Sequence, residues 1–269
     1  MSAAGPPQGA RPLGGAARSA VRGDHTSAAG PPQGATHAPL GGSAAAPAAS
    51  VGALQCAPVN PFTLADWRHT VAEHYAAVRA LAGSDAPAAA LQFRAARERL
   101  LRKHPDSPIA PARRATWGGP HWYPYDPAFR VRGVIDATSP RQTFEIPLAA
   151  DGVLRCTRVG HARFALAGRD FALAMYWLEG YGGGLWLPFS DASSGVDTYG
   201  GGRYLYDTIK GADLGISGAD IVLDFNFAYN PSCAYDDRWS CPLSPPENQL
   251  PYAVAAGERM ARGQATPTG

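Results

Sequence analysis

The aromatic residues of this chain all lie from Phe62 onward, and they comprise 9 Phe, 6 Trp and 11 Tyr. The only charged residues before that point are Arg11, Arg18, Arg22 and Asp24. A segment without aromatic or clustered branched apolar side chains cannot bury enough surface to offset the entropy lost on ordering. We therefore predict a disordered Ala/Gly/Pro-rich tail at 1–61, a single domain at 62–260 and a disordered end at 261–269.

The tail contains an internal duplication. SAAGPPQGA at Ser2–Ala10 is repeated letter for letter at Ser27–Ala35. Two such copies have no apolar face on which to stack, which favours a duplicated linker over a solenoid. Prolines interrupt the stretch in which a secretory signal would have its apolar run. No apolar run approaches the roughly 20 residues that span a bilayer, so we expect a soluble cytoplasmic protein without a membrane partner.

The domain is predicted to begin with two helices. One apolar stripe recurs at spacings of three and four: Leu64, Trp67, Val71, Tyr75, Val78 and Leu81. This pattern predicts a helix capped by Thr63 and ended by Gly83, and Pro87 suits the first turn of a second helix that runs to about Lys103. The outer face of that second helix is basic: Arg94, Arg97, Arg99, Arg102 and Lys103 stand against Glu98. It is either a phosphate- or partner-binding patch or a solvated face.

From His121 onward the apolar pattern has a period of two, which is typical of strands. The predicted strands are 129–136, 143–148, 153–159, 164–167, 171–178, 185–189, 204–206, 221–227 and 250–254. No helix-length segment separates them, so a parallel doubly wound sheet is not expected. We predict a mainly β (α+β) fold, an antiparallel β-sandwich or barrel-like body with an N-terminal helical hairpin.

Common catalytic motifs are absent. The chain has no GxxxxGK[ST], GxGxxG, GxSxG or HExxH pattern, so we predict neither a cofactor nor a metal. The formal net charge of +2 argues against the basic surface of a nucleic-acid binder. Cys156 lies in a predicted strand and is most simply a core residue. Cys233 and Cys241 are eight positions apart and could form a disulfide, flank a reactive thiolate or be buried.

The last third of the chain is rich in polar and aromatic residues. It contains GLWLPFSDASSGVDTYGGG from Gly184, VLDFNFAYN from Val222, PSCAYDDRWSCPLSPPEN from Pro231 and AGER from Ala256. These stretches resemble the signature of the family known as domain of unknown function 1684, PFxDxTxGxxTYxxGRYL, LDFNxAYNPxCA, CPLPPxENxL and AGEK. A looser resemblance extends back to Phe93. The resemblance implies a fold and a characteristic residue cluster but no established activity.

The chain departs from that signature at several positions. Ser190 stands where the family often has Arg, and Phe227 where a basic residue is common. Ser193, Ser244 and Arg259 replace Thr, Pro and Lys. If basic residues at positions 190 and 227 normally bind an anionic ligand in the family, this chain lacks part of that binding site.

The signature places charged and amide side chains at the ends of apolar strands. In a strand, Asp224 and Asn226 would share one face while Leu223, Phe225 and Phe227 share the other. The polar face could line a pocket. Alternatively, Asp224 pairs with Arg203 and the Asn side chains hold turns. A metal site at Asp191, Asp197 and Asp224 is disfavoured because DASSGVD departs from the calcium-loop pattern.

We therefore expect a polar pocket that binds a small molecule or performs catalysis. The alternatives are a binding module without chemistry and a structural domain whose Asp/Arg/Asn network only locks the fold. The candidate catalytic residues are Asp191, Asp197, Asp224 and Cys233. The candidate ligand-binding residues are Tyr199, Arg203, Asn226, Tyr229 and Asn230. On the pocket reading, Asp224→Asn would abolish ligand binding and leave the fold intact, whereas unfolding would support a scaffold role.

Overall fold

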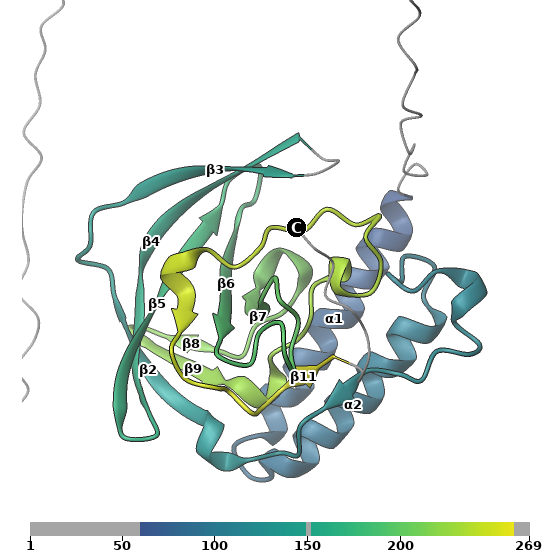
Figure 1. The fold of residues 1–269 in the computed structure, drawn as a ribbon, viewed down its shortest axis with the longest axis horizontal. Coiled ribbons are helices and arrows are strands. Elements are labelled where there is room, and N and C mark those ends of the chain that lie inside the picture. Colours follow the sequence, from purple (N-terminus) through teal and green to yellow (C-terminus); the bar gives the residue numbers. More distant parts are fainter. Residues whose placement is uncertain (1–59, 149–151, 261–269) are drawn as a thin grey trace, which may run out of the picture. The chain divides into compact units, whose positions relative to one another are not determined.

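A computed structural model describes residues 60–148 and 152–260 of the chain (Figure 1). Of the predicted tail at 1–61, only the last two residues are described. The predicted C-terminal end at 261–269 lies outside the described residues, as does Cys56. The predicted domain limits at 62 and 260 therefore stay predictions.

The described chain begins with a helical hairpin, in which α1 (Pro61–Leu81) and α2 (Ala86–Lys103) run antiparallel (Figure 1). The predicted cap at Thr63 is wrong, because the Asn60 side chain accepts the first free N–H, that of Phe62, at 3.0 Å. Pro61 then supplies the fixed φ that suits a first helical residue. The second helix has the predicted extent, and the Asp85 side chain caps it by accepting from the Ala88 N–H at 3.0 Å.

The body is one nine-stranded sheet curled into a half-barrel (Figure 1). Its order is β10-β6-β5-β4-β2-β9-β8, with β3 added to β4 and β7 added to β6. The strands are β2 (Arg130–Asp136), β3 (Gln142–Leu148), β4 (Gly152–Leu166), β5 (Arg169–Leu178), β6 (Gly184–Asp191), β7 (Arg203–Asp207), β8 (Ile216–Ser217), β9 (Asp220–Asp224) and β10 (Gln249–Leu250). All pairs are antiparallel except β10 with β6. A separate antiparallel pair joins β1 (His121–Trp122) to β11 (Glu258–Arg259).

This architecture confirms the predicted mainly β class and its helical hairpin, and it has the barrel-like form. The two strands predicted at 153–159 and 164–167 are one continuous strand, β4, which pairs with β3 and β2 along one edge and with β5 along the other. The register of β4 against β5 shifts next to Gly160, where a Cβ would meet the Asp136 carbonyl oxygen at 2.7 Å. Glycine at this position lets β2 approach β4 closely where the sheet bends.

The predicted strand at 221–227 ends earlier than the period-two pattern indicates. β9 stops at Asp224, and Phe225–Phe227 form a 3₁₀ turn, η4. The Asp224 side chain caps this turn by accepting from the Asn226 N–H at 3.1 Å. The prediction that Asp224 and Asn226 share one face of a strand is therefore wrong, because Asn226 lies in the η4 turn and not in β9.

The main hydrophobic core lies between the hairpin and the curled sheet. Phe93 of α2 packs edge-on against Tyr75 of α1 and against Phe227, with ring centroids 5.2 Å apart in both pairs. Phe225 in turn meets Phe189 of β6 at 5.2 Å. The η4 turn thus carries the aromatic side chains that dock the helices onto the sheet.

Candidate functional site

The signature residues Asp191 and Arg203 form a fully buried ion pair. The Arg203 Nη2 lies 2.6 Å from Asp191 Oδ2, and both side chains are inaccessible to solvent. The guanidinium also donates to three carbonyl oxygens of the C-terminal segment, those of Val254, Ala256 and Glu258. The second carboxylate oxygen of Asp191 accepts from the N–H and the hydroxyl of Ser193. These bonds tie β6, β7 and residues 254–258 together.

Asp224 pairs with Arg130, so the pairing with Arg203 considered from the sequence is wrong. Its Oδ2 lies 3.3 Å from Arg130 Nε, while its Oδ1 accepts from the Asn226 amide at 2.9 Å. Asn226 in turn bonds both the N–H and the carbonyl oxygen of Asp126. Burial raises the pKa of Asp224 to about 6 against the opposing effects of Asn226 and Arg130.

The remaining acidic candidate, Asp197, pairs with a different arginine. Its side chain is 53% exposed and reaches Arg259 Nη2 at 3.4 Å. Within the described residues, Asp191, Asp197 and Asp224 do not gather with other acidic, His or Cys side chains into a cluster that could hold a metal.

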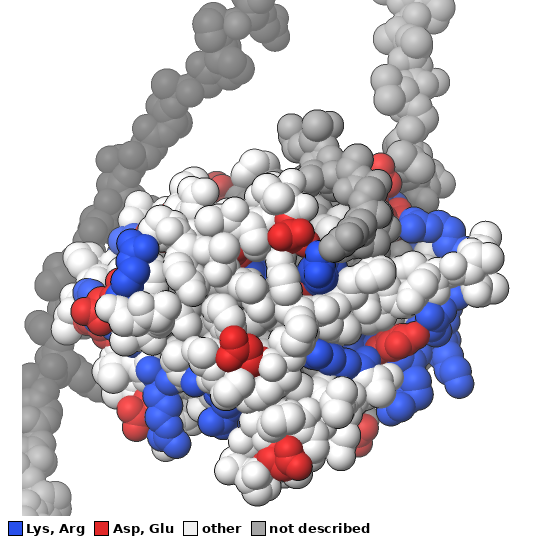
Figure 2. All heavy atoms as spheres, turned by 60° about the horizontal axis from the view of Figure 1, so that its bottom comes forward, with Lys and Arg blue, Asp and Glu red and all other residues white. Residues whose placement is uncertain are grey.

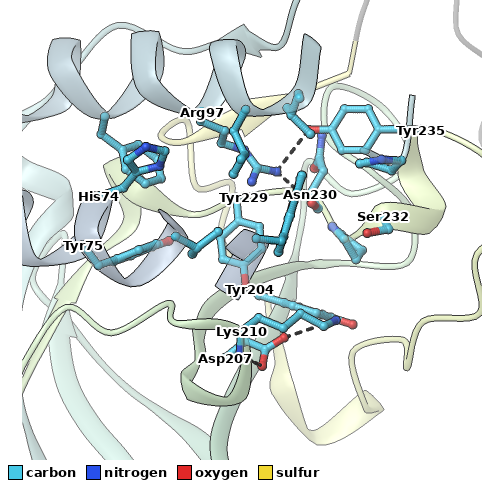
Figure 3. A pocket seen from close by; sticks show the side chains of 17 residues that line it. His74, Tyr75, Arg97, Tyr204, Asp207, Lys210, Tyr229, Asn230, Ser232 and Tyr235 are labelled. Atoms are coloured by element: carbon cyan, nitrogen blue, oxygen red, sulfur yellow. Dashed lines mark hydrogen bonds and ion pairs between the residues drawn. The ribbon is translucent and has the colours of Figure 1, made fainter. Parts of the chain in front are cut away.

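Two of the candidate ligand-binding residues, Tyr229 and Asn230, line a cavity. The cavity has a volume of about 50 Å³ and lies between the helical hairpin and the segments that follow β7 and β9 (Figure 3). Tyr204 of β7 and Tyr229 pair through their backbones, donating to each other's carbonyl oxygens at 3.0 and 3.1 Å. This short bridge holds Tyr229 and Asn230 against the end of the sheet.

A buried network forms one wall of the cavity. Arg97 of α2 donates to Glu258 Oε2 at 3.1 Å, to the Asn230 carbonyl oxygen at 3.1 Å and to the Tyr235 hydroxyl. The guanidinium also stacks over the Tyr229 ring, 4.8 Å from its centroid. Burial lowers the pKa of Arg97, but the contacts with Tyr235 and Glu258 outweigh this effect and raise the pKa above its ordinary value. Arg97 is therefore a fixed cation inside the protein.

Two polar atoms of the residues that line the cavity have no partner. The Tyr75 hydroxyl and the Asn230 Oδ1 are buried and lack a hydrogen bond within the described part of the chain. Tyr75 is 2% exposed and Asn230 is 3% exposed. Buried polar groups are normally paired because an unpaired one costs about 1–3 kcal/mol. The cavity thus presents two groups able to bond a guest molecule.

The lining of the cavity also carries titratable groups of both signs. Lys210, in the η3 turn (Thr208–Lys210), lies 3.4 Å from Asp207 and is 46% exposed (Figure 3). Asp207 raises the pKa of Lys210, which therefore stays charged. Burial, together with Arg99 and Arg97, lowers the pKa of His74, so its ring is neutral at pH 7.

Sequence reasoning missed most of this cavity. Arg97 was assigned to a basic outer face, but it lies four residues after Phe93 on the buried stripe of α2, a spacing that would have placed it inside. Arg102 is also engaged, since it donates to Glu98 and to the Trp117 carbonyl oxygen. Only Arg99 and Lys103 of the predicted basic patch are exposed. On the face in Figure 2, basic and acidic side chains are interspersed.

The other two candidates, Tyr199 and Cys233, are in contact with each other. The Tyr199 hydroxyl donates to the Cys233 sulfur at 3.4 Å. Cys156 is fully buried, which confirms its predicted core position. None of the described helices is both long and apolar enough to cross a membrane.

The chain is similar to one solved structure and to one protein-family model. A solved structure, the solution NMR structure of an uncharacterized protein from Haloarcula marismortui, is 32% identical, with a TM-score of 0.48. The match covers 64% of this chain and 92% of that one. A search of curated proteins gave no match. The model of the family described as "Protein of unknown function (DUF1684)" matches residues 115–259, so the chain belongs to the DUF1684 family.

Proposed function

We propose that this protein binds a small hydroxycarboxylate or aminocarboxylate in the cavity between the helical hairpin and the family's C-terminal segments. The observation that supports this proposal is the presence of two residues with unpaired buried polar atoms, Tyr75 and Asn230, in the lining of one cavity. A hydroxyl or amino group of the bound molecule would donate a hydrogen bond to the unpaired Asn230 Oδ1. Lys210, half-exposed at the cavity, is the cation able to meet a carboxylate.

The size of the cavity limits the guest. One water molecule occupies roughly 10–15 Å³ of such volume, so about 50 Å³ holds only a few non-hydrogen atoms or the head of a larger molecule. The aromatic rings of Tyr75, Tyr204 and Tyr229 supply apolar walls around these polar groups. Mostly apolar walls with a few convergent polar groups are typical of small-molecule sites.

The buried Asp191–Arg203 pair and the Asp224–Asn226 turn each bond several neighbours, which accounts for a structural role, although Arg203 Nε and Asp224 Oδ2 have no hydrogen bond within the described residues. For that reason the proposal rests on the cavity rather than on these residues. Catalysis by Asp191, Asp197, Asp224 or Cys233 stays a prediction, as do a cytoplasmic location and the lack of a nucleic-acid partner.

Isothermal titration calorimetry with glycolate, L-lactate and L-alanine tests the proposal. We expect saturable millimolar or tighter binding of at least one of them, and at least tenfold weaker binding to Tyr75→Phe, since the guest then loses a hydrogen bond worth about 1.4 kcal/mol or more. Tyr206→Phe is the matched control, because the Tyr206 hydroxyl donates to Gly215 and Val222 outside the cavity lining. No binding of any probe, or binding that Tyr75→Phe leaves unchanged, would contradict the proposal.

A further inference from the structure

Two cysteines that the cavity does not use lie next to each other. Cys233 is in the 3₁₀ turn η5 (Ser232–Ala234), and Cys241 is in the loop that follows. The Cys233 N–H donates to the Cys241 sulfur at 3.3 Å. The Cys233 sulfur itself accepts from Tyr199 on its other side. The sulfur of Cys241 is therefore within side-chain reach of the Cys233 sulfur.

The surroundings of Cys241 favour a thiolate. A hydrogen bond from the Cys233 thiol, together with Lys210 and the N–H groups of Ser232 and Cys233, lowers the pKa of Cys241 to about 6 against the opposing effect of burial. Backbone N–H groups at the start of a helical turn and a nearby ammonium are the usual means of stabilising a thiolate. The other titratable groups that act on this pair are the phenols of Tyr199, Tyr204 and Tyr229.

The two cysteines are chemically unequal. Cys241 is partly exposed, whereas Cys233 is 9% exposed. The hydrogen bond with Cys241, followed by burial, raises the pKa of Cys233, which stays a thiol. A solvent-accessible thiolate beside a second thiol is typical of peroxide-sensitive proteins, and Cys241 with Cys233 has this arrangement in a partly exposed form.

We propose that Cys233 and Cys241 are a dithiol that hydrogen peroxide oxidises to a disulfide, with Cys241 as the attacking and Cys233 as the resolving residue. The Cys241 thiolate attacks one peroxide oxygen, the O–O bond breaks, and the departing hydroxide takes a proton to become water. The resulting sulfenic acid is then attacked by Cys233, the S–O bond breaks, and the hydroxyl leaves as water with the Cys233 proton. The two thiols lose two electrons and the peroxide gains them.

This inference shares Lys210 with the proposed carboxylate site, and both of its tests are made without any cavity ligand. Cys156 provides an internal reference, since burial raises its pKa to about 11 and it is fully buried. Cys56 lies outside the described residues, and Cys56→Ser in every sample removes it as an exchange partner.

The first test is peptide mapping of the full chain after reaction with equimolar hydrogen peroxide. We expect a Cys233–Cys241 disulfide, two hydrogens lighter than the dithiol, while Cys156 stays alkylatable. In Cys233→Ser the reaction should stop at the sulfenic acid of Cys241, which dimedone traps. A folded protein that forms no such disulfide, or that oxidises at Cys156 first, would overturn the proposal.

The second test needs no cysteine variant of the pair. At pH 6 the native Cys241 should react with iodoacetamide about tenfold faster than the same residue in the urea-unfolded chain, the gain in thiolate being partly offset by lower intrinsic nucleophilicity. Lys210→Met should reduce this ratio. Equal rates in the folded and unfolded chains would show that Cys241 is an ordinary thiol and exclude the proposed attack.

Discussion

At the scale of single residues, hydrogen bonding distinguishes polar groups that hold the fold together from polar groups that are free to bond a guest molecule. Arg203 donates to a carboxylate and to three carbonyl oxygens, whereas the Tyr75 hydroxyl has no partner among the described residues. Among the Arg203 donors only Nε lacks a partner in the described part of the chain, so this side chain has little left to offer a guest molecule, while the unpaired Tyr75 hydroxyl costs free energy until something binds it. This contrast directs attention to the cavity rather than to the most buried charges.

Two tyrosines allow this argument to be tested by stability. Tyr75→Phe removes an unpaired buried hydroxyl, so we expect the free energy of unfolding of the ligand-free protein to rise by about 1 kcal/mol. Tyr206→Phe removes a hydroxyl that donates to the carbonyl oxygens of Gly215 and Val222, and should lower it by about 1 kcal/mol. Urea denaturation of both variants measures the two changes. Destabilisation of both alike would mean that the Tyr75 hydroxyl already has a partner.

Asp224 should make stability depend on pH. Its pKa in the folded protein, about 6, is above the ordinary value of 3.8, so the folded state holds this proton more tightly than the unfolded state. The stabilisation is complete below pH 4 and is lost as the pH rises through 6, a change of about 3 kcal/mol. Asp224→Asn cannot ionise, and its stability relative to the parent should rise by most of that amount between pH 4 and pH 7. A constant difference across that range, measured by urea denaturation, would show an ordinary pKa.

At the scale of elements, the Asp191–Arg203 pair holds β6, β7 and the C-terminal segment in place. Arg203→Met leaves the Asp191 carboxylate buried and unpaired, which should cost about 3–5 kcal/mol. Adding Asp191→Leu removes that charge, so the double variant should recover part of the loss. A double variant less stable than Arg203→Met would indicate that the remaining bonds of Asp191, from Ser193 and from the Val254 N–H, matter more than the ion pair. Thermal unfolding of the three proteins gives the comparison.

The docking of α1 depends on one glycine. Gly211, at the end of η3, has φ of +85°, and a Cβ there would meet the Ala72 nitrogen at 2.7 Å and the Arg68 carbonyl oxygen at 2.8 Å. Gly211→Ala combines left-handed strain with a clash against helix backbone and should cost about 3 kcal/mol or more. Gly168→Ala is the control: φ is +71° but the space is open, so only about 1 kcal/mol is expected. Equal losses for the two variants would show that α1 shifts freely.

The elements that the sequence predicts well are those whose pattern is local. The helix stripes and the alternation in β2, β3 and β5 depend only on spacing along the chain, and these elements occur within a few residues of their predicted positions. The end of β9 at Asp224 depends instead on a side chain that caps the next turn. The ion pairs follow the same rule: Arg97 with Glu258 and Arg130 with Asp224 join positions far apart, and no local pattern specifies them.

At the scale of the whole molecule, the cavity exists because the hairpin covers the open side of the curled sheet (Figure 1). Its lining comes from α1, α2, β7 and the segment after β9, so no single stretch of sequence could reveal it. Tyr229 and Asn230 were predicted as ligand-binding residues from the strand-end signature. Tyr75 and Lys210 could not be, because they join those residues only once the helices have docked.

We predict that the domain begins at the cap of the first helix. The Asn60 side chain and carbonyl oxygen accept from the Phe62 and Leu64 N–H groups, both at 3.0 Å. A chain of residues 62–260, the limits predicted from composition, lacks this cap and should lose about 1 kcal/mol relative to residues 58–260. The positive charge of its new N-terminus at the helix start would add to that loss.

Urea denaturation of both shortened chains and of full-length Asn60→Ala distinguishes the cap from other effects of the tail. We expect the chain of residues 58–260 to match the full chain, because the described packing of α1 and the sheet lies between residues 60 and 260. Asn60→Ala should reproduce most of the loss seen in the 62–260 chain. If the 58–260 chain were itself much less stable than the full chain, residues before 58 would have to contact the domain, and the proposed limits would be wrong.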